Sequence, residues 1–110
     1  MDVLHRIKRL MIQGKYHFTQ KASDELALDE LDRADAVEAI VNSTHISKVL
    51  RSRSPFRGRA DEKLYVIEGF SYGGTLIYTK GKISREAGEE VYYIFISSKR
   101  STYGSSDEAD

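Results

Sequence analysis

Cysteine is absent from this chain of 110 residues, and proline occurs only once. Without cysteine there is no disulfide, no thiolate metal site and no cysteine nucleophile, a composition that fits a reducing compartment. No apolar run approaches the roughly 20 residues that a transmembrane helix needs. The N-terminus also lacks the apolar stretch of a secretory signal. We therefore expect a cytoplasmic protein with no membrane partner.

Sequence motifs for metals and nucleotides are missing as well. The three histidines, His5, His17 and His45, are too widely spaced for a recognisable metal site, and no cysteine supplements them. The chain has no P-loop, no GxGxxG sequence and no serine nucleophile elbow. We expect neither a metal ion nor a cofactor.

Charge is balanced overall but unevenly distributed. Seventeen basic residues match seventeen acidic ones, so the net charge is zero. Residues 24–38 hold seven acids and one base, whereas residues 45–63 hold six bases and two acids. A segregated basic stretch attracts phosphates locally, because the Debye length is only about 8 Å at physiological salt. The competing interpretation is that such runs are solvated faces or loops.

Hydrophobic spacing and capping residues predict three helices in the first half of the chain. The first spans residues 3–13, with Asp2 as N-cap and Gly14 as C-terminal stop. Thr19 caps the second helix and Asp32 the third. The apolar positions of these helices are Val3, Leu4, Ile7, Leu10, Met11, Ala22, Leu26, Ala27, Val37, Ile40 and Val41.

The second half of the chain has the pattern of strands. Runs rich in β-branched and aromatic residues occur at 46–50, 64–70, 75–79 and 91–97. Gly73-Gly74 suits a tight hairpin turn, and residues 80–90 are expected to form a longer hairpin loop. The prediction is an α+β fold with N-terminal helices packed on one face of a mostly antiparallel sheet. We expect one domain over residues 1–100, followed by a flexible acidic tail at 101–110.

A basic loop and a sheet face are the candidate sites. Residues 51–59 interleave arginine with serine, glycine and one aromatic, and guanidinium groups bind phosphate bidentately. Tyr78 and Lys80 are two residues apart, so they project from the same face of a strand. Lys99 approaches that face if the last two strands pair, and Lys48 is a further candidate. The residues expected to bind RNA are Arg51, Arg53, Arg57, Arg59, Lys80 and Arg100.

Several short motifs follow one another along the chain: Thr19-Gln20-Lys21-Ala22, Lys48, Glu62 ahead of Leu64-Tyr65, Tyr78-Thr79-Lys80 and Ser97-Ser98-Lys99. In this order the chain resembles the small RelE-superfamily toxins, and most closely the MqsR-type mRNA interferases. The resemblance extends from about Arg9 to Arg100. It implies a RelE-like fold, RNA as substrate, and a cognate antitoxin protein as partner.

The resemblance also implies a cleavage site made of Lys48, Glu62, Tyr78 and Lys99. This chain departs from the family at Glu62, where the family has glutamine, and in a longer basic loop, so Arg51 or Arg53 is an alternative to Lys48. The implied reaction is metal-independent cleavage by the RNA 2′-hydroxyl, with lysines and arginines stabilising the phosphorane. Glu62, Tyr78 and a lysine all remain candidates for the general base.

Two other interpretations are compatible with the same residues. One is a non-catalytic module that binds RNA or a partner protein through the basic loop and the sheet edge. The other is a dimeric structural domain with no role in nucleic-acid binding.

Overall fold

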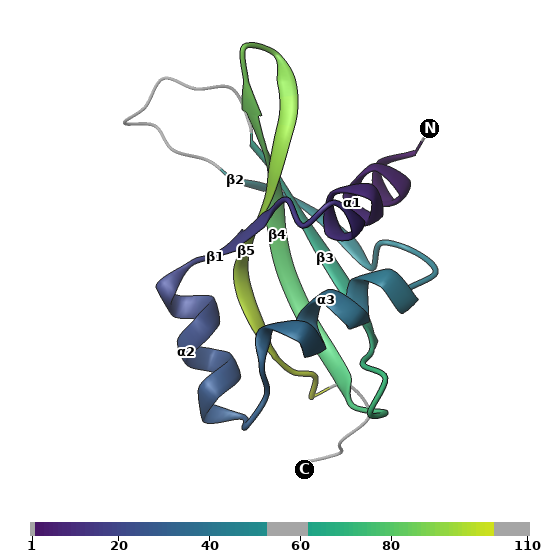
Figure 1. Cartoon of the computed structure of the whole chain (residues 1–110), viewed down its shortest axis with the longest axis vertical. Helices are drawn as coiled ribbons and strands as arrows, with labels where there is room; N and C mark the ends of the chain where they lie inside the picture. Colours follow the sequence, from purple (N-terminus) through teal and green to yellow (C-terminus); the bar gives the residue numbers. More distant parts are fainter. Residues whose placement is uncertain (1, 53–61, 103–110) are drawn as a thin grey trace.

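The computed structural model describes residues 2–52 and 62–102, which form three helices around one five-stranded sheet (Figure 1). The expected α+β class is confirmed. The strands lie in the order β1-β5-β4-β3-β2, and all neighbours are antiparallel except β1 and β5. In chain order the elements are α1 (Val3–Ile12), β1 (Tyr16–Phe18), α2 (Gln20–Leu28), α3 (Arg33–Asn42), β2 (Lys48–Ser52), β3 (Glu62–Phe70), β4 (Leu76–Glu86) and β5 (Glu89–Arg100).

Each helix begins at the capping residue that the sequence predicts. Asp2 accepts a hydrogen bond from the backbone N–H of His5 at 2.8 Å, and Thr19 accepts one from Ala22 at 3.1 Å. Asp32 and Asp35 accept reciprocally from each other's backbone N–H groups, which forms a capping box at the start of α3. These side chains satisfy N–H groups that have no partner within the helix.

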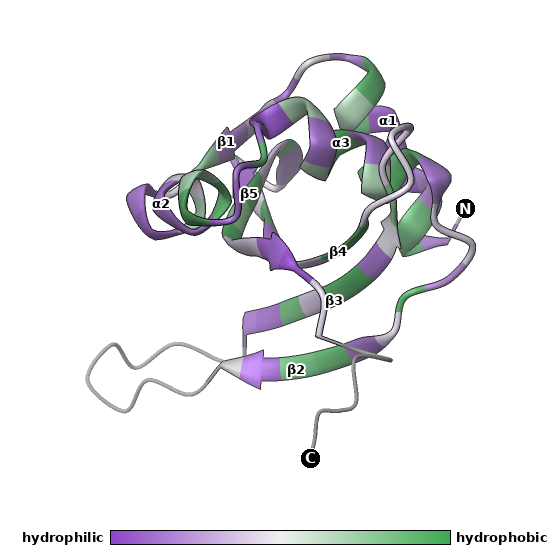
Figure 2. Ribbon diagram, turned by 90° about the horizontal axis from the view of Figure 1, so that it is seen from below, coloured by the Kyte–Doolittle hydropathy of each residue, from purple (hydrophilic) through white to green (hydrophobic). Residues whose placement is uncertain are grey.

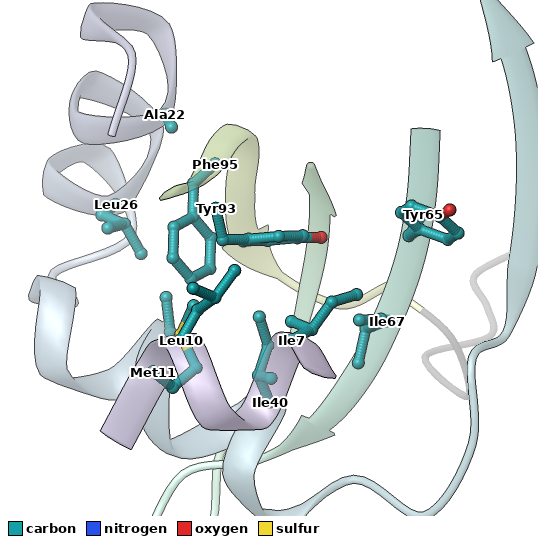
Figure 3. Packing of buried hydrophobic residues seen from close by; sticks show 11 residues of the cluster. Ile7, Leu10, Met11, Ala22, Leu26, Ile40, Tyr65, Ile67, Tyr93 and Phe95 are labelled. Atoms are coloured by element: carbon teal, nitrogen blue, oxygen red, sulfur yellow. The ribbon is translucent and has the colours of Figure 1, made fainter. Parts of the chain in front are cut away.

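The helices cover one face of the sheet, and β2 lies farthest from them (Figure 2). Each helix contributes a fully buried residue to the core, namely Ile7, Leu26 and Ile40. They pack against strand residues that include Ile67, Tyr93 and Phe95 (Figure 3). The other face carries no helix in the described part of the chain, and we call it the open face. None of the three described helices has both the length and the apolar character needed to span a bilayer.

The prediction of a long loop at residues 80–90 was wrong. β4 and β5 continue through most of this stretch, and the turn is confined to Ala87 and Gly88, whose φ angles are +52° and +82°. Gly81 lies within β4, where the ring of Tyr93 packs over it and leaves no room for a larger residue. A Cβ at Gly81 would lie 2.6 Å from that ring. Burial also raises the pKa of the Tyr93 hydroxyl, which points toward Tyr65 (Figure 3).

The structure differs from the prediction at two further places, a short edge strand and the start of the expected tail. β1 was not predicted, because three residues are too few for a recognisable pattern; it pairs in parallel with β5 over Tyr93 to Phe95. Ser101, assigned to the flexible tail, donates from its backbone N–H to the carbonyl of Leu76 at 2.9 Å. The rest of the expected tail, residues 103–110, lies outside the described residues.

The contact between α3 and β3 gives a test of the packing. A Cβ at Gly69 would overlap the carbonyl oxygen of Ala39. We expect Gly69→Ala to lower the free energy of unfolding by about 3 kcal/mol, because backbone must move to admit the methyl group. The matched control is Gly73→Ala, whose added Cβ would meet only the hydroxyl of Ser71 at 3.7 Å. Chemical denaturation measures both, and equal stability of the two variants would contradict the packing.

Candidate functional site

Three polar side chains lie side by side on the open face. In the strand register Tyr78 is directly opposite Glu68 on β3 and Lys99 on β5. Their strand neighbours Ile77 and Thr79 are fully buried on the helix side, so this row faces away from the helices. The Lys99 ammonium lies 5.6 Å from the centre of the Tyr78 ring. The expectation that Tyr78 and Lys99 share a face is confirmed.

This row of Glu68, Tyr78 and Lys99 lines a shallow pocket of about 400 Å³. The chain that follows β5 forms the rest of its wall, and Ser101 donates a hydrogen bond to the Glu68 carboxylate at 2.6 Å. Sequence reasoning missed Glu68. The available signal was an acid inside the apolar run 64–70, at a position that alternation places opposite the buried residues.

Lys80 and Lys48 extend the cationic character of the open face. Both belong to the next row, in which Val66 pairs with Lys48 on one side and with Lys80 on the other. Lys80 is two residues, about 7 Å, from Tyr78 along β4, and Lys48 is two strands, about 10 Å, farther across the sheet. Lys48 is exposed and Lys80 half-buried. Lys48 therefore faces the same side as the row without touching it.

Glu62 and Arg51 do not join this group. Glu62 begins β3, six residues and about 20 Å from Glu68, and accepts a hydrogen bond from the Lys82 ammonium at 2.9 Å. Arg51 pairs with Lys63, which places it on the opposite face of the β2–β3 ladder from Lys48. The cleavage site implied by the resemblance is thus only partly assembled: Glu62 stands apart, and Glu68 occupies the place beside Tyr78.

Of the other arginines expected to bind RNA, the structure describes one, Arg100. Arg100 contacts the C-terminal end of α2, where its backbone N–H donates to the Asp29 carboxylate at 2.8 Å and its guanidinium to the Asp29 carbonyl at 3.2 Å. A cation at this position complements the helix dipole. Arg53, Arg57 and Arg59 lie outside the described residues.

Lys99 reaches the open face because β5 contains a bulge. Lys80 pairs with Ser97, but the next residue of β4, Gly81, pairs with Phe95, so Ile96 is an extra residue. In regular alternation Phe95 and Lys99 would share a face, and Lys99 would point toward the helices. Because of this one additional residue, every side chain that follows it in β5 lies on the opposite face from the one that regular alternation would give it.

Two carboxylates, one from α2 and one from its C-cap residue Asp29, hold the strand on either side of Lys99. Glu25 accepts from the Ser97 hydroxyl at 2.7 Å and from the Ser98 backbone N–H at 3.0 Å. Asp29 accepts from the backbone N–H of Arg100. Glu25 and Asp29 are four residues apart and so lie on one face of the helix. The two contacts fix the backbone before and after Lys99.

Glu25 is ionised where it contacts the strand. Burial by itself raises the pKa of this carboxyl, but the hydrogen bonds from Ser97 and Ser98 and the ammonium of Lys21, 3.3 Å away, outweigh that effect. The net result is a pKa below the ordinary value of 4.5. The negative charge is therefore stabilised in the folded protein.

Within residues 2–52 and 62–102, no group of three histidine or acidic side chains is placed to hold a metal ion. Comparison with protein-family models, with curated proteins and with solved structures found no match.

The contact between Glu25 and β5 predicts a pH-dependent stability. We expect Glu25→Gln to lower the free energy of unfolding by about 1–2 kcal/mol at neutral pH, because an amide accepts these hydrogen bonds less strongly than a carboxylate. Since the pKa of Glu25 is lowered on folding, its contribution is present above 4.5 and is lost as the pH falls through the folded value. The stability difference between wild type and variant should shrink below that pH. Urea titrations across a pH series measure it.

The control for this experiment is Glu30→Gln, which removes an exposed acid just beyond α2. We expect it to change the stability by less than about 0.5 kcal/mol. A difference between wild type and Glu25→Gln that persists unchanged to low pH would rule out the ionised contact.

Proposed function

We propose that the protein is a metal-independent endoribonuclease of the RelE-like toxin type, closest to the MqsR-type mRNA interferases. The observation that carries the proposal is the row of Glu68, Tyr78 and Lys99 on the open face, with further lysines in the adjacent row. A carboxylate, a phenol and an ammonium are together the groups that acid–base cleavage of a phosphodiester requires. The proposal includes a cytoplasmic location and a cognate antitoxin as partner.

In the proposed reaction the RNA supplies its own nucleophile. Glu68 takes the proton of the 2′-hydroxyl, the 2′-oxygen forms a bond to the adjacent phosphorus, and the bond from phosphorus to the 5′-oxygen breaks. Lys99 stabilises the negative charge of the phosphorane, and Tyr78 donates a proton to the leaving 5′-oxygen. The products are a 2′,3′-cyclic phosphate and a 5′-hydroxyl, and exchange with water returns the proton from Glu68 to Tyr78.

Glu68 replaces Glu62 as the proposed base for a geometric reason. A general base must lie within hydrogen-bond reach of the proton that it removes. Glu62 is bound to Lys82 at the far end of β3, whereas Glu68 is the direct neighbour of Tyr78. Lys48 and Lys80 serve binding, because they lie in the row adjacent to Tyr78 and face the same side of the sheet.

Variants in the row test the chemistry. Purified protein incubated with RNA in EDTA should yield fragments that end in 2′,3′-cyclic phosphate. Glu68→Gln, Tyr78→Phe and Lys99→Met should each lower kcat by roughly 100-fold or more, the usual effect of losing a proton-transfer group or a charge stabiliser. Lys63→Met is the matched control, because Lys63 is an exposed lysine on the other face of β3.

The outcomes separate the two functions that the residues allow. Cleavage that survives all three substitutions would end the assignment of this row. Intact RNA that is nevertheless retained by the wild-type protein in low salt favours a non-catalytic RNA-binding module. No cleavage and no retention would overturn both.

Salt dependence tests the binding role of the second row. Each lysine that contacts a phosphate of single-stranded RNA contributes about 0.7 to the slope of log K against log salt. We expect Lys48→Ala and Lys80→Ala each to reduce the slope by about that amount, with little change in kcat at saturating RNA. Filter binding of a 2′-deoxy strand, which has no 2′-hydroxyl to attack the phosphorus, measures the slope. An unchanged slope in both variants would remove these lysines from the interface.

A further inference from the structure

An aromatic side chain stands exposed on the open face beside the row of Glu68, Tyr78 and Lys99. Phe70 is 55% exposed at the end of β3 and pairs with Leu76 on β4. Its neighbour Gly69 lies against the backbone of α3, so Phe70 points to the side away from the helices. Phe70 does not belong to the hydrophobic core cluster.

The position of Phe70 distinguishes it from other exposed apolar residues. The large hydrophobic side chains exposed in the described residues are Ile12, Leu28, Val49, Phe70 and Tyr72. Of these, only Phe70 belongs to a strand and faces the open side, two residues or about 7 Å from Glu68. Leu76 lies directly opposite on the same face and is half-buried. Together they form an apolar strip next to the polar row.

We propose that Phe70 is a stacking subsite for a nucleobase of single-stranded RNA, adjacent to the phosphate held at Tyr78 and Lys99. The inference rests on the proposed function and names the form of RNA that the site takes. Unpaired bases stack on aromatic rings while cationic side chains hold the backbone, and here the ring and the lysines share one face. A duplex keeps its bases stacked on one another and offers no free base surface to Phe70.

Charge on the open face agrees with a nucleic-acid occupant. Four lysines, Lys48, Lys80, Lys82 and Lys99, share the face with Glu62 and Glu68, and two further acids, Glu86 and Glu89, lie at the far end of the β4–β5 hairpin. Of these four lysines, Lys82 alone forms an ion pair with a carboxylate in the described part of the chain. The two rows next to the apolar strip hold Lys48, Lys80 and Lys99 against one acid, Glu68, so the charge there is positive and suits the anionic backbone of RNA.

Fluorescence tests the subsite directly, since the chain has no tryptophan. Phe70→Trp places a single tryptophan at the subsite. We expect its emission to be quenched by a single-stranded 2′-deoxy oligonucleotide, and much less by the same strand with abasic positions or by a preformed duplex. Equal responses to all three would overturn the inference.

Kinetics supply the second readout. Phe70→Ala should raise KM for single-stranded RNA about tenfold, Phe70→Tyr should retain the wild-type value, and Ile12→Ala, an exposed apolar control on α1, should change nothing. If wild type cleaves RNA and Phe70→Ala has an unchanged KM, the stacking subsite is wrong while the proposed function stands. If neither wild type nor any variant cleaves RNA but the fluorescence of Phe70→Trp responds selectively to unpaired bases, the proposed nuclease activity is wrong while the stacking subsite stands.

Discussion

The end of β5 beyond its pairing with β1 is the constraint on which the open face depends. β1 stops at Phe18, opposite Phe95, so the residues that follow in β5 have a strand partner on one side only. Backbone N–H groups on such an edge must be satisfied by water, by another chain or by side chains. Here Glu25 and Asp29 accept from Ser98 and Arg100, so α2 takes the place of a further strand. Those contacts follow the bulge that turns Lys99 to the open face, and they hold the backbone on either side of Lys99.

The same contacts give the uneven charge distribution a structural reason. Two acids of the stretch 24–38 are used to hold β5 from the side of α2, whereas the lysines of β2, β4 and β5 occupy the opposite face. The acidic run is therefore more than a solvated helix surface, the reading that composition alone favours. A protein of zero net charge can in this way present a cationic region around Lys48, Lys80 and Lys99.

Interactions within a few residues could be predicted from the sequence, and those that depend on strand register could not. The caps at Asp2 and Thr19 involve residues only three positions away, so local pattern was sufficient. The sequence assigns Gly81 to a loop, because glycine is common in turns. In the structure a glycine is needed there because the ring of Tyr93 on the neighbouring strand leaves no room for a Cβ. Glu62 and Glu68 both lie in β3, and only the register shows which one adjoins Tyr78. The bulge at Ile96 could not be predicted, because the residues around it form one continuous apolar and aromatic run.

The order of the row on the open face matters for the chemistry proposed. Glu68 and Lys99 are separated by the strand that carries Tyr78, which places their backbones about 10 Å apart. On adjacent strands a glutamate and a lysine in these positions would pair directly, and each would mask the charge of the other. With Tyr78 between them, the carboxylate contacts Ser101 and the ammonium lies by the Tyr78 ring. Neither contact pairs the Glu68 carboxylate with the Lys99 ammonium, so both charges remain available to a ligand. In the proposed reaction the carboxylate, the phenol and the ammonium would serve the 2′-hydroxyl, the leaving oxygen and the phosphoryl oxygens of a phosphodiester.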